Sequence, residues 1–445
     1  WIEKMQIRTL TALVALTGVA HGLDNGLGKT PLLGWNTWKT CGDSGCTHDY
    51  CDEHEVKSVA QAMIDNGMQA LGWNYINLDD CWAYSRDNIT NQLTWDTDRF
   101  PSGIPALTEW LHDRGFKFGL YTSAGNATCS SGGRDITVPG SEGYYTEDAN
   151  AFAAWGVDYV KLDWCGDVKD KFVIDGYEDG YNYHKEFSEA LNATGRPMYL
   201  ETVAGYWFLK HDTSKYSNSW RFCTDHHDEY ESTIEAVGCR IDEGNRPFNL
   251  TLGESGSWPY MDFLMTGGNG CSPYEENIEG MHCPGQSDNN YKTEFNLWSI
   301  TQSPMIVATD TRNMTNIMNQ ALLNNEIIEI HQSVLTPPGQ LIAGGQFGSE
   351  GYCNGCELWT RQILLNENDN DHSILAVFVN WRQHNEISMN ITATWEQLGF
   401  APGTSITVRD LWTHQDWENI ISGIDQITVV DVPPGGSMML KLTPS

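Results

Sequence analysis

Short β-rich runs alternate with helix-like stretches between about residues 30 and 330. The stretches at 53–68, 106–115 and 147–156 repeat apolar residues every three or four positions, which is the spacing of one helix face. Eight alternations over roughly 300 residues predict a (β/α)8 TIM barrel, a fold of about 250 residues before insertions. The predicted strands lie at 32–36, 75–80, 116–123, 157–164, 198–203, 219–225, 260–265 and 305–310.

Nearly every predicted strand ends in a polar residue. In a barrel the carboxyl ends of all strands meet at one rim, where the loops form the active site. Turns also favour Asp and Asn, but that preference does not easily account for so regular a repetition. A doubly wound open sheet is the alternative fold, yet no G-x-G-x-x-G follows the first strand. The strand-end residues are Asn36, Asp79, Asp80, Ser123, Asp163, Glu201, Asp225, Asp262 and Asp310.

The pattern changes after about residue 333. Pro337, Pro338 and Gly339 interrupt the chain, and no helical periodicity follows. Short β-rich runs separated by turn residues predict an antiparallel β-sandwich. We therefore expect a catalytic barrel at 23–332 and a C-terminal β-sandwich domain at 333–445. The predicted sandwich strands lie at 374–381, 387–395, 405–412, 426–432 and 437–443.

The N-terminal segment has the layout of a secretory signal peptide. Arg8 precedes an apolar run that reaches Val19, and small residues follow at 20–22. A buried N-terminal strand or helix is the alternative. We treat residues 1–4, which precede Met5, as an artefact and expect the mature chain to begin near Leu23.

Composition also favours secretion. Twelve cysteines fit an oxidising compartment, and a net charge of −33 disfavours nucleic acid and anionic lipid as partners. No later segment is apolar for the ~18 residues that a membrane helix needs. We expect an extracellular protein, with delivery to a lysosome or vacuole as the alternative. Six Asn-x-Ser/Thr sites predict glycosylation at Asn88, Asn126, Asn192, Asn249, Asn313 and Asn390.

Two strand ends carry acids with charged neighbours. Lys161 precedes Asp163 by two residues, so both lie on one face of the strand and the ammonium stabilises an ionised, nucleophilic carboxylate. A structural Asp–Lys pair is the alternative. Asp225 is followed by further acids, which raise a carboxyl pKa as a proton donor requires, whereas Arg221 lowers it. The direction of the net shift stays open.

Asp79 and Asp80 can accept paired hydrogen bonds from vicinal sugar hydroxyls. A metal site at this pair, or at His226 and His227, is the competing reading, but the i, i+4 histidine spacing is missing. Cys353 and Cys356 have zinc-ligand spacing without a second close pair, so we predict no metal. Aromatic residues at the same strand ends can stack on sugars or fill the core; they are Trp35, Trp38, Trp82, Trp164 and Tyr121.

Two acids, hydroxyl-binding carboxylates and aromatic platforms are the parts of a glycosidase. The chain contains no G-x-S-x-G, H-E-x-x-H or P-loop motif, so serine hydrolases, zincins and kinases lack their parts. The motifs resemble those of the melibiase-type α-galactosidases, glycoside hydrolase family 27. They are TPLLGWNTW (30–38), YINLDDCW (75–82), FGLYTSAGNATC (118–129), DYVKLDWC (158–165), NSWRFCTD (218–225) and NLWSITQSPMIVATD (296–310).

The resemblance implies retaining hydrolysis of terminal α-D-galactosyl residues without a metal or organic cofactor. It implies Asp163 as nucleophile and Asp225 as acid/base. An α-N-acetylgalactosaminidase or a β-L-arabinopyranosidase of the same family is the alternative, and a non-catalytic sugar-binding barrel is a more distant one. The resemblance implies a substrate-binding set of Trp38, Asp79, Asp80, Tyr121, Lys161, Glu201, Arg221 and Asp262.

The resemblance also implies disulfides Cys41–Cys81 and Cys129–Cys165, and makes Cys46–Cys51 plausible. The family's cysteine before Glu201 is replaced by Leu200 here, so we expect Cys223 to pair with Cys239 instead. Glu201 favours a 2-hydroxyl on the sugar, whereas the small Ala204 leaves room for an N-acetyl group. The family pattern N-D-P-D-M appears as WPYMDFL (258–264), with Asp262 as the matching acid.

Overall fold

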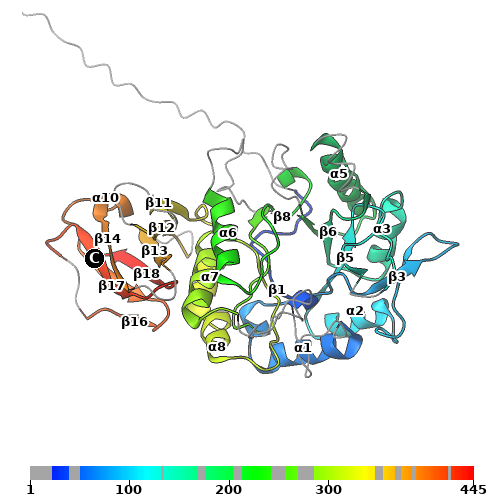
Figure 1. Ribbon diagram of the computed structural model, residues 1–445, viewed down its shortest axis with the longest axis horizontal. Coiled ribbons are helices and arrows are strands. Elements are labelled where there is room, and N and C mark those ends of the chain that lie inside the picture. Colours follow the sequence, from blue (N-terminus) through cyan, green and yellow to red (C-terminus); the bar gives the residue numbers. More distant parts are fainter. Residues whose placement is uncertain are drawn as a thin grey trace, which may run out of the picture.

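The computed structural model describes residues 23–39, 51–131, 135–167, 177–203, 213–241, 256–268, 285–345, 354–365, 372–382, 387–418 and 422–445. Several predictions concern positions outside this part of the chain: the signal peptide at 1–22, Cys41, Cys46, Ala204, Asn249 and Cys353. Figure 1 shows two bodies side by side, a barrel with helices around it and a smaller β-rich domain.

Eight parallel strands form the first body, in the order β10-β1-β2-β5-β6-β7-β8-β9. A parallel bridge between Leu264, just after β9, and Val307 in β10 joins the two ends of the sheet. The predicted (β/α)8 barrel is therefore confirmed. The strands are β1 (Leu33–Asn36), β2 (Tyr75–Asn77), β5 (Lys117–Ser123), β6 (Tyr159–Asp163), β7 (Tyr199–Val203), β8 (Ser219–Arg221), β9 (Trp258–Tyr260) and β10 (Met305–Val307).

The seventh barrel strand differs from its prediction at 260–265. It occupies Trp258–Tyr260 and ends before Asp262, whose φ of 79° is incompatible with an extended strand. A hairpin of β3 (Ala83–Arg86) and β4 (Leu93–Trp95) between β2 and the next helix was not predicted.

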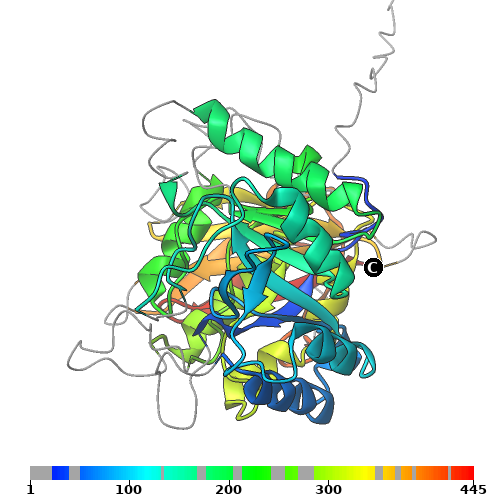
Figure 2. The same cartoon turned by 90° about the vertical axis from the view of Figure 1, so that its right-hand side faces the viewer.

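Helices surround the barrel sheet, as the two orthogonal views show (Figures 1 and 2). The three predicted helices are found as α1, α2 and α3; α1 and α2 are shorter than their apolar patterns, and α3 begins and ends two residues earlier than predicted. Among the described residues, none of the helices combines the length and apolar composition of a membrane span. The helices are α1 (Glu53–Asp65), α2 (Ile104–His112), α3 (Tyr145–Ala154), α5 (Tyr177–Ala193), α6 (Tyr230–Ile241), α7 (Asp288–Ile300), α8 (Asn316–Leu322) and α9 (Asn325–Gln332).

The C-terminal body consists of two antiparallel sheets. The larger has the order β11-β12-β13-β18-β15-β16, and β14 pairs with β17 in the smaller. Apolar side chains from both sheets, including Phe378, Val408 and Val429, form one core, which confirms the predicted β-sandwich. The elements are β11 (Gln340–Gly344), β12 (Cys356–Ile363), β13 (Ser373–Asn380), β14 (Met389–Thr394), α10 (Trp395–Leu398), β15 (Ile406–Asp410), β16 (Gln415–Asp416), β17 (Gln426–Val432) and β18 (Ser437–Pro444).

Helix α7 joins the two bodies. It contacts β12, β13 and β18, and sandwich residues such as Trp359 and Met439 belong to the same apolar core as the barrel helices. Thr293 and Asn296 of α7 each donate a hydrogen bond to Ser437 Oγ, at 3.0 and 2.8 Å. The face of α7 opposite the sandwich packs on the barrel, so this helix belongs to both domains.

Candidate active site

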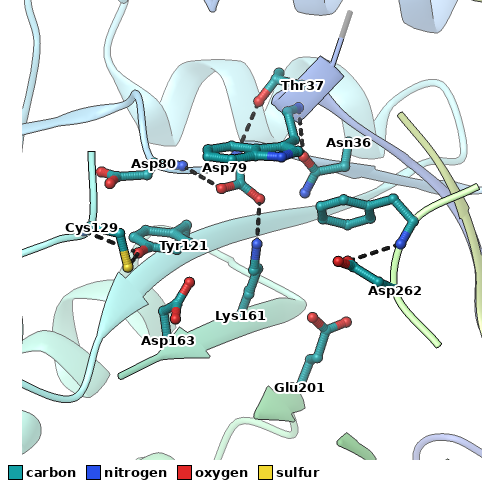
Figure 3. A network of polar contacts seen from close by, with 12 residues as sticks. Asn36, Thr37, Asp79, Asp80, Tyr121, Cys129, Lys161, Asp163, Glu201 and Asp262 are labelled. Atoms are coloured by element: carbon teal, nitrogen blue, oxygen red, sulfur yellow. Dashed lines mark hydrogen bonds and ion pairs between the residues drawn. The ribbon is translucent and has the colours of Figure 1, made fainter. Parts of the chain in front are cut away.

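Polar side chains from different strands point into one space at the carboxyl end of the barrel sheet (Figure 3). Asp79 follows β2, Lys161 and Asp163 lie on β6, and Glu201 lies on β7. Asp262 reaches the same space from the segment after β9 (Figure 3). The structure thus brings together acids that are up to 183 positions apart in sequence (262 against 79).

A buried ion pair lies at the centre of this cluster. Lys161 Nζ lies 2.9 Å from Asp79 Oδ2, and both residues are almost fully buried. Burial disfavours the charge of Lys161, but Asp79 and Asp163 outweigh it and raise its pKa. The rings of Trp38, Tyr121 and Phe263 surround the ammonium, at 5.6, 5.4 and 4.8 Å. Lys161 therefore stays charged at neutral and acidic pH.

Asp163 is buried beside this ammonium, with 8% of its surface exposed. One carboxylate oxygen accepts a hydrogen bond from the Trp164 amide at 2.9 Å. Burial raises the pKa of Asp163, and Lys161 and Arg221 oppose that shift without cancelling it. The sequence reading, in which Lys161 stabilises the ionised form, identified the right partner but missed the larger effect of desolvation.

Asp225 has the opposite environment. Its Oδ1 lies 2.6 Å from Arg221 Nη2, and 52% of its side chain is exposed. Arg221 lowers the pKa of Asp225 to about 2, against the smaller opposing effect of burial. Arg221 also lowers the pKa of Asp163, and Asp225 raises it, so both predicted catalytic carboxyls lie within one electrostatic cluster.

Two of the predicted sugar-binding residues have partners in the loop that follows β5. Asp80 Oδ2 accepts hydrogen bonds from the Ser130 amide at 2.6 Å, the Ser130 hydroxyl at 3.0 Å and the Ser131 amide at 3.2 Å. The hydroxyl of Tyr121 donates to Cys129 Sγ at 3.0 Å. These contacts fix the loop that borders the cluster.

Glu201 is fully buried at the base of the cluster. Its Oε2 accepts a hydrogen bond from the Tyr159 hydroxyl at 2.6 Å. Burial raises the pKa of Glu201 to about 8, although Lys161 and Tyr159 act in the opposite direction. At neutral and acidic pH this carboxyl group is protonated.

The aromatic set divides into two groups. Trp38 and Trp164 are partly buried beside the cluster, whereas Trp35 and Trp82 are fully buried and donate their indole N–H groups to backbone carbonyls. Trp35 and Trp82 therefore fill the core and are not available to stack on a sugar. Phe263, which sequence reasoning missed, faces Lys161, and no local sequence pattern distinguishes it from a core aromatic residue.

The disulfides agree with the predictions in part. Cys129–Cys165 and Cys223–Cys239 are bonded, as expected. Cys81 is bonded to Cys51, so the predicted pairs Cys41–Cys81 and Cys46–Cys51 are wrong. Cys51 lies just before Asp52, the N-cap residue of α1.

Cys129, Asp163 and Cys165 place three potential metal-ligand atoms within 4.8 Å of one another. Both sulfurs belong to the Cys129–Cys165 disulfide, and a metal ligand would have to be a thiolate. The ring of His226 is engaged with the carbonyl of Phe263 at 2.8 Å and with Thr233 at 3.2 Å. Contacts within the protein therefore account for the positions of Cys129, Cys165 and His226.

Comparison with known proteins covers both domains. The melibiase family descriptions "Alpha galactosidase A" and "Alpha galactosidase C-terminal beta sandwich domain" match residues 30–333 and 354–442. The chain is 31% identical to an alpha-galactosidase of Cyamopsis tetragonoloba over 407 residues, which cover 90% of this chain and 84% of the relative. It is 30% identical to a probable alpha-galactosidase of Dictyostelium discoideum, with 98% of each chain covered.

Solved structures give the same result. Alpha-galactosidase I of Mortierella vinacea is 28% identical and superimposes with a TM-score of 0.73, covering 94% of this chain and 98% of that one. A β-L-arabinopyranosidase of Geobacillus stearothermophilus, at 22% identity and a TM-score of 0.76, shares the fold. With its barrel, its sandwich and its rim of carboxylates, the chain belongs to the alpha-galactosidase family, glycoside hydrolase family 27.

Proposed function

We propose that this protein is a retaining exo-α-galactosidase that hydrolyses terminal α-D-galactosyl residues. The observation that carries the proposal is that Asp163 and Asp225 lie in one electrostatic cluster. In this cluster Lys161 and Arg221 each act to lower the pKa of both carboxyl groups. Glycoside hydrolysis requires two carboxyl groups at one site. Family membership supplies the substrate class.

In the proposed mechanism the Asp163 carboxylate attacks the anomeric carbon while Asp225 transfers a proton to the leaving oxygen. The glycosidic bond breaks as the galactosyl–Asp163 ester forms. Water, deprotonated by Asp225, then attacks the anomeric carbon and releases galactose and free Asp163. Lys161 supports the charge that returns to Asp163.

The contact between Arg221 and Asp225 has a consequence for this mechanism. A carboxyl whose pKa is near 2 carries no proton at working pH, so it cannot act as the acid while Arg221 pairs with it. Substrate binding must therefore screen Asp225 from the guanidinium. Because the Asp225 side chain is half-exposed, a bound sugar can reach it.

Recognition of galactose is proposed for the remaining predicted residues. Asp79 and Asp80 would accept hydrogen bonds from sugar hydroxyls, and Trp38 would stack on the ring. An α-galactosidase of the same fold from Saccharomyces cerevisiae was solved with raffinose, which makes raffinose a first oligosaccharide to test.

The alternative activities within the family differ at the 2-position and at C6 of the sugar. The carboxyl group of Glu201, buried near Arg221, can hydrogen-bond a sugar hydroxyl, and it favours a 2-hydroxyl over an N-acetyl group. Comparing kcat/KM on nitrophenyl α-galactoside, α-N-acetylgalactosaminide and β-L-arabinopyranoside separates the three. We expect the galactoside to be preferred; a preference for either other sugar would contradict the assignment.

Substitution of the two acids tests the proposal. Asp163→Asn should reduce kcat to background, and Asp225→Ala should reduce it by about 10²–10⁴-fold for substrates with poor leaving groups. Asp310→Asn is the matched control, because Asp310 also follows a barrel strand but is held by Arg312 at 2.8 Å. Near-normal turnover by Asp163→Asn would remove Asp163 from the nucleophile role.

We also propose that the protein is secreted and glycosylated. The described sequon asparagines are all exposed, which glycan attachment requires; they are Asn88, Asn126, Asn192, Asn313 and Asn390. The disulfides fit an oxidising compartment. Expression in a eukaryotic host tests this proposal: we expect the protein in the medium, with a mass that falls after treatment with an N-glycosidase.

A further inference from the structure

The segment after β9 contains a buried residue in an unusual backbone conformation. Asp262 has a φ of 79°, in the left-handed region that favours glycine, and only 2% of its surface is exposed. A non-glycine residue keeps such a conformation only where its surroundings enforce it, and such residues cluster at functional sites. The contacts of Asp262 therefore indicate what the strain is used for.

Helix α7 holds this segment from one side. The indole N–H of Trp298 donates to the main-chain carbonyl of Asp262 at 2.8 Å. One helical turn earlier, the carboxyl group of Glu294 accepts from the Met265 amide and the Thr266 hydroxyl, each at 2.7 Å. Because Glu294 and Trp298 are four residues apart, they lie on one face of α7 and clamp both ends of the segment.

On its other side Asp262 holds the segment that carries Asp225. Its Oδ2 accepts from Arg221 Nη1 at 3.0 Å and from the His226 amide at 2.8 Å. These two donors lie four residues before and one residue after Asp225. The same guanidinium reaches Asp225 through Nη2 at 2.6 Å. The position of the Asp225 carboxyl group is therefore coupled to that of Asp262.

Trp298 also directly contacts His226, the residue that follows Asp225. The ring of His226 packs on the indole with centroids 5.2 Å apart, and its Nδ1 bonds the Phe263 carbonyl at 2.8 Å. Glu294 lies 3.7 Å from the same nitrogen. Trp298, Asp262 and His226 thus form a closed, buried set of contacts directly behind Asp225. Such a set resists displacement because moving one member breaks contacts to both others.

We propose that Trp298 is a positioning residue for the acid/base: through Asp262 and His226 it fixes the segment that carries Asp225 in the position from which this carboxyl group protonates the leaving group. The inference rests on the proposed function, in which Asp225 is that acid/base. Trp298 is buried in α7, behind the cluster, and acts only through the residues that it holds.

The proposal makes a prediction that depends on the leaving group. A misplaced acid slows the departure of an alcohol that needs a proton, and a shift of about 1 Å can cost about 10²-fold. A dinitrophenolate leaves without protonation, so its departure does not depend on Asp225. A general loss of structure would slow both substrates by the same factor.

Trp298→Phe removes the indole N–H while keeping an aromatic ring. We expect kcat/KM for melibiose to fall about 10- to 100-fold and kcat/KM for 2,4-dinitrophenyl α-galactoside to stay within about threefold. Trp73→Phe is the matched control, because Trp73 is equally buried and donates its indole N–H to the Leu322 carbonyl at 3.0 Å, away from the cluster. In that variant both substrates should change by one common, small factor.

Equal losses on the two substrates in Trp298→Phe, or the same split in Trp73→Phe, would overturn the proposal. If Trp298→Phe yields no folded protein, Asp262→Asn decides, since asparagine tolerates the left-handed backbone but lacks the charge that faces Arg221. Its kcat/KM should fall by a larger factor for melibiose than for the dinitrophenyl substrate, and equal losses would again overturn the inference. Asp225→Ala separates a failure of this inference from a failure of the proposed function. If the loss of kcat/KM in that variant does not depend on the leaving group, Asp225 is not the acid/base and the proposed function itself fails.

Discussion

Arg221 lies where the two predicted catalytic carboxyl groups influence each other. Its guanidinium pairs with Asp225 and Asp262 and also lowers the pKa of Asp163. The buried Asp163 holds its proton more tightly than an ordinary aspartate, whereas Asp225 releases its proton more readily. This charge distribution is the reverse of the working state, so the substrate must screen Asp225 from Arg221 before the first step.

The pH dependence of activity tests the environment of Asp163. The nucleophile must be ionised, so kcat/KM should fall as the pH falls through the raised pKa of Asp163. Lys161→Met removes the cation that lowers this pKa, and the acidic limb of the profile should move to higher pH. Lys117→Met is the control, because Lys117 contacts Tyr75 at the opposite end of the barrel. An acidic limb at unchanged pH in Lys161→Met would contradict the effect of Lys161 on the pKa of Asp163.

Sequence reasoning reached the residue types of the site but not their energetics. Motifs at strand ends identified Asp163, Asp225 and Lys161 because barrel topology requires strand ends to meet. The balance between desolvation and neighbouring charges depends on distances in three dimensions, so the shift of Asp163 was missed. Phe263 was missed for the same reason, since no local pattern separates a platform aromatic from a core one.

At the scale of elements, the barrel strands were predictable because β-rich runs and polar ends recur in step. The bounds of β9 were not predictable, because Asp262, with its left-handed backbone conformation, ends the strand earlier than predicted. The hairpin β3–β4 was also missed, since each of its strands has only one buried residue, Ala83 in β3 and Leu93 in β4. Strands without an apolar run lack the pattern on which prediction depends.

The β3–β4 hairpin is anchored to α3 by a buried ion pair. Arg86 donates to both carboxylate oxygens of Asp148, at 2.7 and 2.8 Å, and to the Gly140 carbonyl at 2.7 Å. Arg86→Ala would leave Asp148 buried without its cation, and we expect a loss of about 3–5 kcal/mol in the free energy of unfolding. Urea unfolding measures this change.

A solvent-exposed pair of the same charge type provides the control. Lys185 and Glu189 lie 3.8 Å apart with 41% and 61% of their side chains exposed. Lys185→Ala should change the free energy of unfolding by less than about 1 kcal/mol. A loss of that small size in Arg86→Ala would show that the hairpin is not held by the buried pair.

At the scale of the whole molecule, buried ionisable groups make stability depend on pH. Burial raises the pKa of Glu201 and Glu294 to about 8 and that of Glu357 to about 7. The folded protein keeps these protons where the unfolded chain releases them, so stability falls as pH rises from about 4.5 toward 8. Burial lowers the pKa of His184 to about 4 and that of His331 to about 3, so their effect opposes this trend, but only below about pH 6.5.

The melting temperature should therefore fall slowly between pH 5 and 6.5, where two histidines partly offset three glutamates, and more steeply between pH 6.5 and 8. Scanning calorimetry across this range measures the effect. Glu357→Gln should reduce the slope above pH 6.5, whereas Glu189→Gln, at an exposed site, should leave it unchanged. A melting temperature that rises from pH 6.5 to 8 would contradict the buried, protonated state of these glutamates.

The most direct test of the whole account is to find which residue becomes bonded to the sugar. A slowly released fluorinated α-galactosyl fluoride should leave a galactosyl group on the enzyme, and peptide mass spectrometry should locate it on Asp163. A label on another residue, or turnover that inverts the anomeric configuration without any labelled peptide, would contradict the covalent mechanism proposed for Asp163 and Asp225.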